Sequence, residues 1–184
     1  MRFMTDRTIL RAYMPGDAEQ LLKIWGDPDV QELLFTGRCP SPLTLDFVEQ
    51  TLACWLLPPS FLAIIEDRKT GAFIGEVGLL TRKAGDREAS IGITIAREFR
   101  GRGYGSEVMR WIVGFGFRDM HLTRISLHVF EGNERAVALY QNLGFIHEGE
   151  SQQEAWVQGR WQKVLLMGLQ ENEWDIVKKR RRIP

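Results

Sequence analysis

Glycines alternate with charged and aromatic residues in the segment Arg100-Gly101-Arg102-Gly103-Tyr104-Gly105. The segment follows an alternating apolar stretch over 89–96 and precedes helical spacing over about 103–120, so it connects a strand to a helix. The first turn of a helix leaves backbone N–H groups unpaired and attracts anions. Glycine removes the side chains that would keep a phosphate away, and Arg100 and Arg102 add positive charge. These residues predict a pyrophosphate-binding loop.

Other phosphate-binding loops fit this segment badly. No Lys-Ser/Thr pair follows the glycines, so it is not a Walker A sequence. The spacing is G-x-G-x-G rather than G-x-G-x-x-G, and no acidic residue ends the next strand to hold a ribose, which argues against a dinucleotide fold. The remaining alternative for the loop alone is a flexible connection without a ligand.

A second motif, N-E-R-A-V-A-L-Y-Q-N-L-G-F, occupies residues 133–145. Together, the two stretches resemble the signature of the GNAT superfamily of N-acetyltransferases, in which a Gln/Arg-x-x-Gly-x-Gly/Ala loop precedes an N-x-x-A-x-x-x-Y-x-x-x-G-F helix. Both parts match in order and spacing, and the resemblance extends from about Ile9 to Leu169. It implies an enzyme that transfers an acetyl group from acetyl-CoA to a primary amine.

The end of the chain is similar to the branch of ribosomal-protein N-terminal and spermidine acetyltransferases, whose ending is E-G-x(4)-E-x(3)-N-G-R. The similar residues are Gly149-Glu150, then Glu154, then Gln158-Gly159-Arg160. Gln158 replaces the usual Asn, and Lys163 stands where an acidic residue is common. The acceptor is therefore left open between a protein N-terminus, a polyamine and another small amine.

The resemblance also implies a binding site for acetyl-CoA. The backbone around Ile93 and Ile95 pairs with the pantetheine arm, which requires an open strand edge. The backbone amides of Arg102 to Ser106 hold the pyrophosphate. Asn133 is expected to cap a helix, because Asn is a favoured N-cap residue. The resemblance implies that it also hydrogen-bonds the pantetheine.

Tyr140 is the predicted general acid. The CoA thiolate has a pKa near that of Cys, roughly 8.5, and a phenol with a pKa of about 10 can give that sulfur a proton. The alternative for Tyr140 is a packed aromatic beside Leu139 and Leu143.

A base is also needed, because an ammonium group cannot attack a thioester. The candidates are Glu76, Glu88 and Glu154. We favour Glu154, since it matches the Glu near the acceptor site in the branch named above. A chain of water molecules is an alternative route for the proton.

The remaining candidates for the site are aromatic. Three tryptophans could line the acceptor site, namely Trp25, Trp55 and Trp156, although core packing explains them equally well. The three histidines lack ligand-like spacing, so they are assigned structural roles and no metal is predicted. Neither Cys39 nor Cys54 lies in a nucleophile motif, so transfer is expected to be direct, in a ternary complex. The alternative function is a non-catalytic acetyl-CoA-binding module, which the intact Tyr140 argues against.

The elements that position these residues follow from hydrophobic periodicity. Helices are predicted over about 15–25, 44–55, 103–120 and 133–143. Strands are predicted over 8–13, 61–65, 73–80, 89–96, 124–129, 145–156 and 163–169. This order predicts a single mixed α/β domain over 1–184 with one central sheet. The family resemblance implies a GNAT-like fold with a mixed, mostly antiparallel sheet of about seven strands flanked by four helices. Its core spans about 8–170, and 171–184 is expected to be a basic tail.

Composition limits the class of protein. Of 184 residues, 44% are hydrophobic, which suits one domain with a substantial core. Lys plus Arg and Asp plus Glu both total 24, so a dedicated nucleic-acid binder is not expected. The apolar runs are far shorter than the roughly 20 residues of a membrane span, and no signal peptide is evident. We expect a cytoplasmic protein with reduced thiols; the basic run 178–182 leaves nuclear import open, and the family resemblance leaves a homodimer open.

Overall fold

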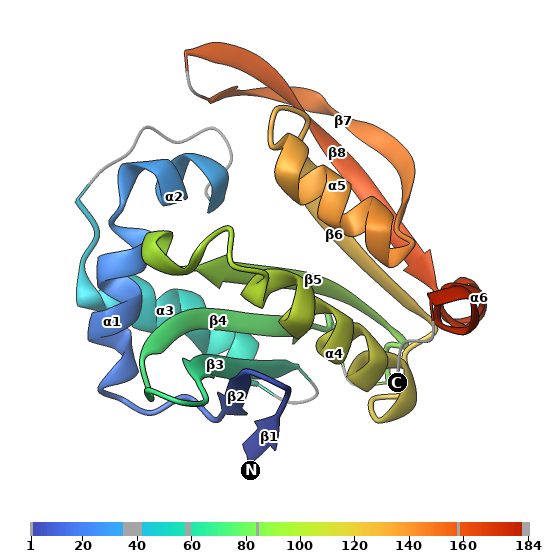
Figure 1. Ribbon diagram of the computed structural model, residues 1–184. Coiled ribbons are helices and arrows are strands. Elements are labelled where there is room, and N and C mark those ends of the chain that lie inside the picture. Colours follow the sequence, from blue (N-terminus) through green and yellow to red (C-terminus); the bar gives the residue numbers. More distant parts are fainter. Residues whose placement is uncertain (1, 35–41, 58–59, 84, 158, 182–184) are drawn as a thin grey trace.

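The computed structural model describes residues 2–34, 42–57, 60–83, 85–157 and 159–181 (Figure 1). These residues form one eight-stranded sheet in the order β1-β2-β3-β4-β5-β6-β8-β7. Neighbouring strands are antiparallel except for β5 and β6, which are parallel. The predicted α/β domain with a mixed, mostly antiparallel sheet is confirmed.

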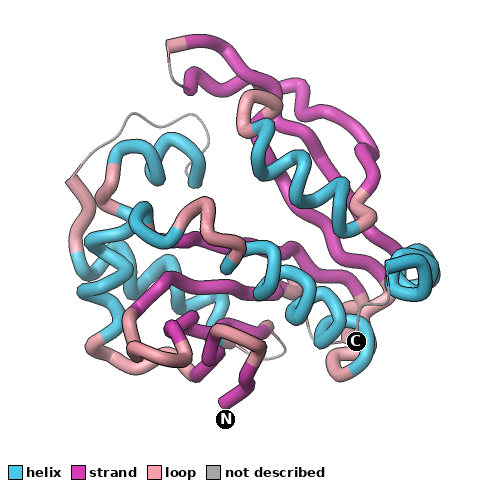
Figure 2. Tube along the Cα trace, viewed as in Figure 1, coloured by secondary structure: helices cyan, strands magenta, loops and turns pink. Residues whose placement is uncertain are grey.

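The helices lie on both sides of this sheet (Figure 2). The strands are β1 (Arg2–Met4), β2 (Thr8–Arg11), β3 (Phe61–Asp67), β4 (Phe73–Leu80), β5 (Glu88–Ile95), β6 (Arg124–Phe130), β7 (Ile146–Val157) and β8 (Arg160–Gln170). The helices are α1 (Asp17–Trp25), α2 (Pro28–Leu34), α3 (Leu45–Leu56), α4 (Tyr104–Arg118), α5 (Glu134–Leu143) and α6 (Glu171–Arg181), and a short 3₁₀ turn, η1, covers Arg97–Phe99.

Alternation along β3 explains the two layers. Ala63 and Ile65 face a core that contains the buried side of α4, whereas Ile64 faces a second core built from α1, α2 and α3. Successive side chains of a strand point to opposite faces, so one apolar run supplies both cores. The sheet therefore carries α4 and α5 on one face and α1 to α3 on the other.

Three elements differ from the sequence prediction. β1 has only three residues and lies at the sheet edge, so it shows no usable alternation. The segment from Pro28 was expected to be a loop, yet α2 begins there, since proline suits the first position of a helix. The described residues thus form eight strands and six α-helices rather than about seven and four.

The third difference concerns the expected tail. Residues 171–181 form α6, and Trp174 is only 4% exposed because it packs into the core beneath α4. The backbone N–H of Glu171 also donates to the carbonyl oxygen of Thr123 over 3.1 Å. Much of this segment is therefore part of the folded domain. Among the described helices, none has the length and apolar character to span a bilayer.

Candidate active site

The sheet opens between β5 and β6. These two strands pair only from Glu88 to Ser90, opposite Arg124 to Ser126. Beyond that point β5 stays paired with β4 as far as Ile95, while β6 stays paired with β8 over its whole length. Each strand follows its own neighbour, so the two halves of the sheet diverge (Figure 1). The edge of β5 over 91–95, which includes Ile93 and Ile95, is thereby left without a partner strand.

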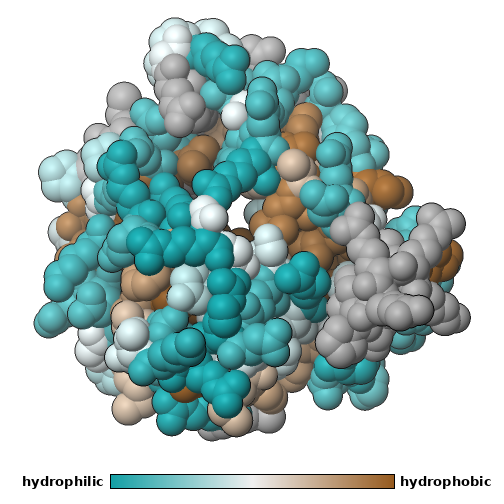
Figure 3. Space-filling model, in the orientation of Figure 1, coloured by the Kyte–Doolittle hydropathy of each residue, from teal (hydrophilic) through white to brown (hydrophobic). Residues whose placement is uncertain are grey.

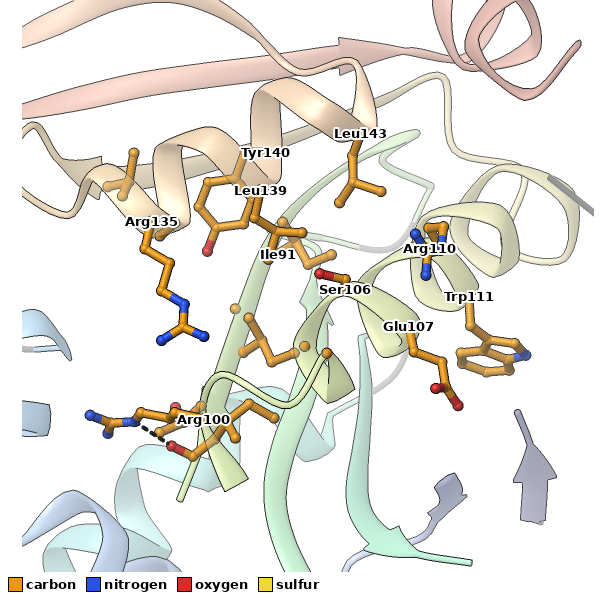
Figure 4. Close-up of a pocket in the computed structure, with 18 of the residues that line it drawn as sticks. Ile91, Arg100, Ser106, Glu107, Arg110, Trp111, Arg135, Leu139, Tyr140 and Leu143 are labelled. Carbon is orange, nitrogen blue, oxygen red and sulfur yellow. Dashed lines mark hydrogen bonds between the residues drawn. The ribbon is translucent and has the colours of Figure 1, made fainter. Parts of the chain in front are cut away.

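A cleft of about 1960 Å³ occupies this opening. One side is lined from α4 and α5 by Ser106, Tyr140 and Leu143, which face the same cavity in Figure 4. The other side is lined from α2 and α3 by Leu33 and Trp55. The space-filling view is hollowed near its middle, with hydrophobic residues gathered beside the hollow (Figure 3). The cleft is therefore accessible to groups from both faces of the sheet.

The glycine-rich loop forms one end of the cleft. Gly101 and Gly103 have φ values of 80° and 86°, a left-handed conformation that favours glycine. Gly103 is also the N-cap of α4, and no side chain caps that end of the helix. The first N–H groups of α4, at Tyr104, Gly105 and Ser106, are thus available to an anion.

Three side-chain hydrogen bonds hold this loop in place. The Arg100 Nε–H group donates to the carbonyl oxygen of Ile95 over 2.8 Å. Arg7 Nη1 donates to the carbonyl oxygen of Arg102 over 2.8 Å, and the Tyr104 hydroxyl donates to Asp67 over 2.6 Å. Arg100 lines the cleft, whereas the side chains of Arg102 and Tyr104 do not. Those two residues bring only their backbone to the predicted anion site.

Glu107 is an acidic residue in the first turn of α4 that lines the cleft. Its carboxylate accepts hydrogen bonds from the backbone N–H of Arg7 at 2.8 Å, from Arg7 Nε at 2.7 Å and from the Thr5 hydroxyl. Burial alone would raise the pKa of Glu107, but these hydrogen bonds outweigh it and hold the pKa below the ordinary value. The negative charge is therefore neutralised by the N-terminal segment rather than turned toward an incoming anion.

Arg135 is a site residue that the motif analysis missed. It lies in the first turn of α5 and extends across the cleft toward the loop (Figure 4). A Cβ atom on Gly101 would lie only 2.9 Å from its Nη2 atom. Positive charge is unfavourable at a helix N-terminus. An Arg in this position therefore indicates a compensating negative charge, such as that of an anionic ligand, and this signal was present in the sequence. Arg135 and Arg100 approach the mouth of the cleft from opposite sides.

Asn133 and Tyr140 belong to the same helix-forming motif. Asn133 caps α5 by accepting a hydrogen bond from the N–H of Ala136 over 3.3 Å, and it also lines the cleft. The ring of Tyr140 points from α5 into the cavity (Figure 4) and contacts Phe145 edge-on at a centroid distance of 6.0 Å. Burial raises the pKa of Tyr140 to about 12. Its hydroxyl is therefore protonated throughout the physiological pH range.

The three predicted base candidates lie in different surroundings. Glu88 is exposed and forms an ion pair with Arg124 at 3.3 Å. Glu154 lies in β7 opposite Lys163, but its side chain is outside the described residues, so its role stays a prediction. Glu76 is buried in β4, and burial, as the largest influence, raises its pKa to about 7.

The aromatic candidates are also separated. Trp55 lines the cleft. Trp25 is buried and its indole N–H donates to Glu76 over 3.0 Å. Trp156 is exposed on β7 and packs edge-on against Trp161 at a centroid distance of 5.5 Å. His128 was assigned a structural role from the sequence, but its side chain is exposed on β6 and lines the cleft.

The remaining predictions concern cysteine and metal chemistry. Cys39 and the side chain of Cys54 lie outside the described residues. Among the residues that are described, no three His, Cys, Asp or Glu side chains gather into a group that could hold a metal ion.

Comparison with known proteins adds independent information on the chain. Residues 7–146 match the model of the acetyltransferase (GNAT) domain family. The chain is 27% identical over 176 residues to a protein of Bacillus subtilis (strain 168) named provisionally as the ribosomal N-acetyltransferase YdaF, covering 94% of this chain and 96% of the relative. It is 32% identical over 111 residues to spermidine N(1)-acetyltransferase of Vibrio cholerae, covering 60% of this chain and 64% of that enzyme.

A solved structure shows the same arrangement. The spermidine N-acetyltransferase from Vibrio cholerae, crystallised with CoA and spermine, superimposes with a TM-score of 0.79 at 26% identity. The match covers 91% of this chain and 97% of that one.

Proposed function

The chain belongs to the GNAT acetyltransferase family and is an N-acetyltransferase, and from this premise we propose that it transfers the acetyl group of acetyl-CoA directly to a primary amine. The acceptor is a protein N-terminus, a polyamine or another small amine. The observation that carries the proposal is the opening between β5 and β6. The cleft in this opening is lined both by the glycine-rich N-terminus of α4 and by Tyr140 of α5.

The open edge of β5 suits the pantetheine arm of acetyl-CoA. Its backbone groups over 91–95 lack a partner strand, and amide groups of the arm can pair with them as a neighbouring strand would. Asn133 lies across the cleft from this edge and has amide hydrogens left to donate after capping α5. The arm would thus be held from both sides.

The loop suits the pyrophosphate for three reasons. Its glycines admit a close approach to the backbone, the first N–H groups of α4 have no side-chain cap, and the dipole of α4 favours negative charge there. Arg100 and Arg135 add positive charge from the two sides of the cleft. The ion pair with Arg7 compensates the negative charge of Glu107, which would otherwise repel the phosphates.

Tyr140 is proposed to protonate the departing sulfur. Because burial holds its pKa at about 12, it is a neutral phenol when the amine attacks the thioester carbonyl. The bond between that carbon and sulfur then breaks, and the Tyr140 hydroxyl gives its proton to the thiolate. The nitrogen of the new amide still carries an extra proton after this step and gives it to the phenolate, so that Tyr140 ends the cycle unchanged.

The acceptor is proposed to enter from the α2 and α3 side of the cleft. Leu33, Trp55 and His128 line that side, which offers aromatic and apolar contacts to the stem of an amine. The relatives include proteins named for ribosomal and for spermidine acetylation, and a relative solved with spermine. These names support an amine acceptor and leave its identity to experiment.

The decisive experiment is an acceptor screen. The protein is incubated with acetyl-CoA and a panel of N-terminal peptides of ribosomal proteins, spermidine, spermine and aminoglycosides. CoA release and product mass are measured together. We expect one acceptor class to gain an acetyl group with equal release of CoA. Tight acetyl-CoA binding without turnover on every amine would instead support a non-catalytic binding module.

A further inference from the structure

Glu76 is a buried acidic residue in the middle of the sheet. It lies in β4, directly opposite Thr94 of β5 and Ile64 of β3. Its side chain is 7% exposed and points to the face of the sheet that carries α1, as its hydrogen bond to Trp25 shows. Acidic side chains are almost never buried without compensation, so this position requires an explanation.

Hydrogen bonds compensate the burial of the Glu76 carboxyl group only in part. Oε1 accepts the hydrogen bond from Trp25 over 3.0 Å, but Oε2 has no hydrogen-bond partner of good geometry among the described residues. The groups that face the carboxyl from α1, β3 and β5 are Trp25, Ile64 and Thr94, none of which carries a charge. A glutamine could satisfy Trp25 without the cost of burying a charge. A purely structural role therefore does not account for a carboxyl group.

Thr94 connects this carboxyl to the cleft. Its side chain shares a face with Glu76, because directly paired residues of neighbouring strands point the same way. The Thr94 hydroxyl lies close enough to the carboxyl to lower its pKa. Thr94 also lines the cleft, in the part of β5 that has no partner strand on its other side. Thr94 thus lies between the buried acid and the cleft.

Resting on the function proposed above, we propose that Thr94 and Glu76 form a proton relay that deprotonates the acceptor amine before it attacks. The ammonium group gives a proton to the Thr94 oxygen, and the Thr94 hydroxyl gives its own proton to Glu76 Oε2. The neutral amine then attacks the thioester. After the product leaves, Glu76 returns this proton through Thr94 to solvent. The second proton lost by the nitrogen goes to the CoA sulfur by way of Tyr140.

The surroundings of Glu76 suit this task. Burial, as the largest cause, raises its pKa, while Thr94 and Trp25 lower it, and the balance is about 7. An efficient base has a pKa near the working pH. Glu88, in contrast, is exposed and paired with Arg124 at the closed end of the opening. His128 is an exposed titratable group on the same cleft, so the experiment must separate it from Glu76.

The test compares two acceptors for each variant. One is the best amine from the screen, and the other is its β,β-difluorinated analogue, whose ammonium group is far more acidic, so that a large share of it is already neutral in the upper half of the pH range used. The ratio of variant to wild-type kcat/KM is measured for both, over pH 5.5–9. Variants are Glu76→Gln, Thr94→Val and Thr94→Ser, with Glu88→Gln as the matched control. His128→Gln is added to test the other titratable group on the cleft, and only its pH dependence is compared. Stabilisation by acetyl-CoA verifies that each variant folds.

Glu76→Gln should lower kcat/KM for the ordinary amine by about 10²-fold or more, which is the usual value of general base catalysis. For the fluorinated amine the loss should be at least tenfold smaller, because no base is needed. Thr94→Val should behave like Glu76→Gln, and Thr94→Ser should retain the wild-type pattern. The rise of the wild-type rate through pH 7 should disappear in Glu76→Gln and persist in Glu88→Gln and in His128→Gln.

Equal losses on both amines would overturn the relay, since they would indicate a structural or binding role. An unchanged rate in folded Glu76→Gln, or loss of the pH dependence in His128→Gln instead, would overturn it as well. A wild-type protein that acetylates no amine would remove the proposed function and the relay together, and that result is distinct from the others.

Discussion

Replacing Glu76 by Gln should change how the stability of the protein depends on pH. The substitution keeps the size of the side chain and its acceptor for the Trp25 N–H group, but removes the ionisation. Because the carboxyl is buried and has no charged neighbour facing it, its ionisation weakens the folded state. The effect can be separated from catalysis, since it requires no substrate.

The magnitude follows from the pKa of Glu76, which burial raises from an ordinary value of 4.5 to about 7. Each pKa unit corresponds to about 1.36 kcal/mol, so ionisation should cost the folded state about 3 kcal/mol. The pKa is higher in the folded state than in the unfolded state. The stabilisation is therefore complete below pH 4.5, declines as the pH rises toward 7 and is lost above about pH 8.

Urea unfolding from pH 4.5 to 8.5 measures this effect. The difference in unfolding free energy between Glu76→Gln and wild type should shift by about 3 kcal/mol in favour of the variant across that range. The change of this difference with pH is compared, rather than its value at one pH, because any loss of stability from a poor fit of the Gln amide is the same at every pH and cancels. Glu88→Gln is the control and should show a shift below about 1 kcal/mol, because Glu88 forms an exposed ion pair. A flat difference for Glu76→Gln would refute the claim that this carboxyl is buried with incomplete compensation of its charge.

Three other substitutions test the loop, its support and the last helix. Gly103→Glu should abolish the rise in melting temperature that acetyl-CoA gives, because it places a carboxylate in a left-handed N-cap position at the anion site; an unchanged rise in the folded variant would contradict the loop assignment. Arg7→Met should raise the acetyl-CoA dissociation constant about tenfold in a titration, since Glu107 and the Arg102 carbonyl lose a charged hydrogen-bond donor. Unaltered affinity would mean that the loop does not need Arg7 to bind acetyl-CoA. Trp174→Ala should lower the unfolding free energy in urea by about 3–5 kcal/mol, because this side chain is 4% exposed; a loss below about 1 kcal/mol would show that α6 does not belong to the core.

Much of the fold could be predicted because periodicity and turn chemistry agree along most of the chain. β4 was predicted over 73–80 and is found there, between the turn that follows β3 and a polar loop. α5 begins after Asn133 and ends at Gly144, as the cap residues indicated. β1 and α2 were missed because three and seven residues are too short for a period to show. α6 was missed because its sequence is highly charged, and among its described side chains only Trp174 is buried.

The site could be predicted where a motif is local and not where distant segments meet. The glycine-rich loop and Tyr140 come from continuous stretches, and both line one cleft. The contact of Arg7 with Glu107 joins residues a hundred positions apart. The approach of Thr94 to Glu76 depends on the register of β4 against β5. No spacing in the sequence fixes that register, so neither contact could be inferred before the fold was known.

The kinetic effect of Tyr140→Phe tests the central claim most directly. The change removes one hydroxyl and keeps the ring that packs against Phe145, so acetyl-CoA affinity should stay within about twofold while kcat falls by about 10²–10⁴-fold, the usual value of general acid catalysis. Losses of an interaction made in the transition state appear in kcat and kcat/KM together. Near-wild-type kcat with the best acceptor would show that the thiolate departs without help from Tyr140, and that this residue only packs against its neighbours in α5.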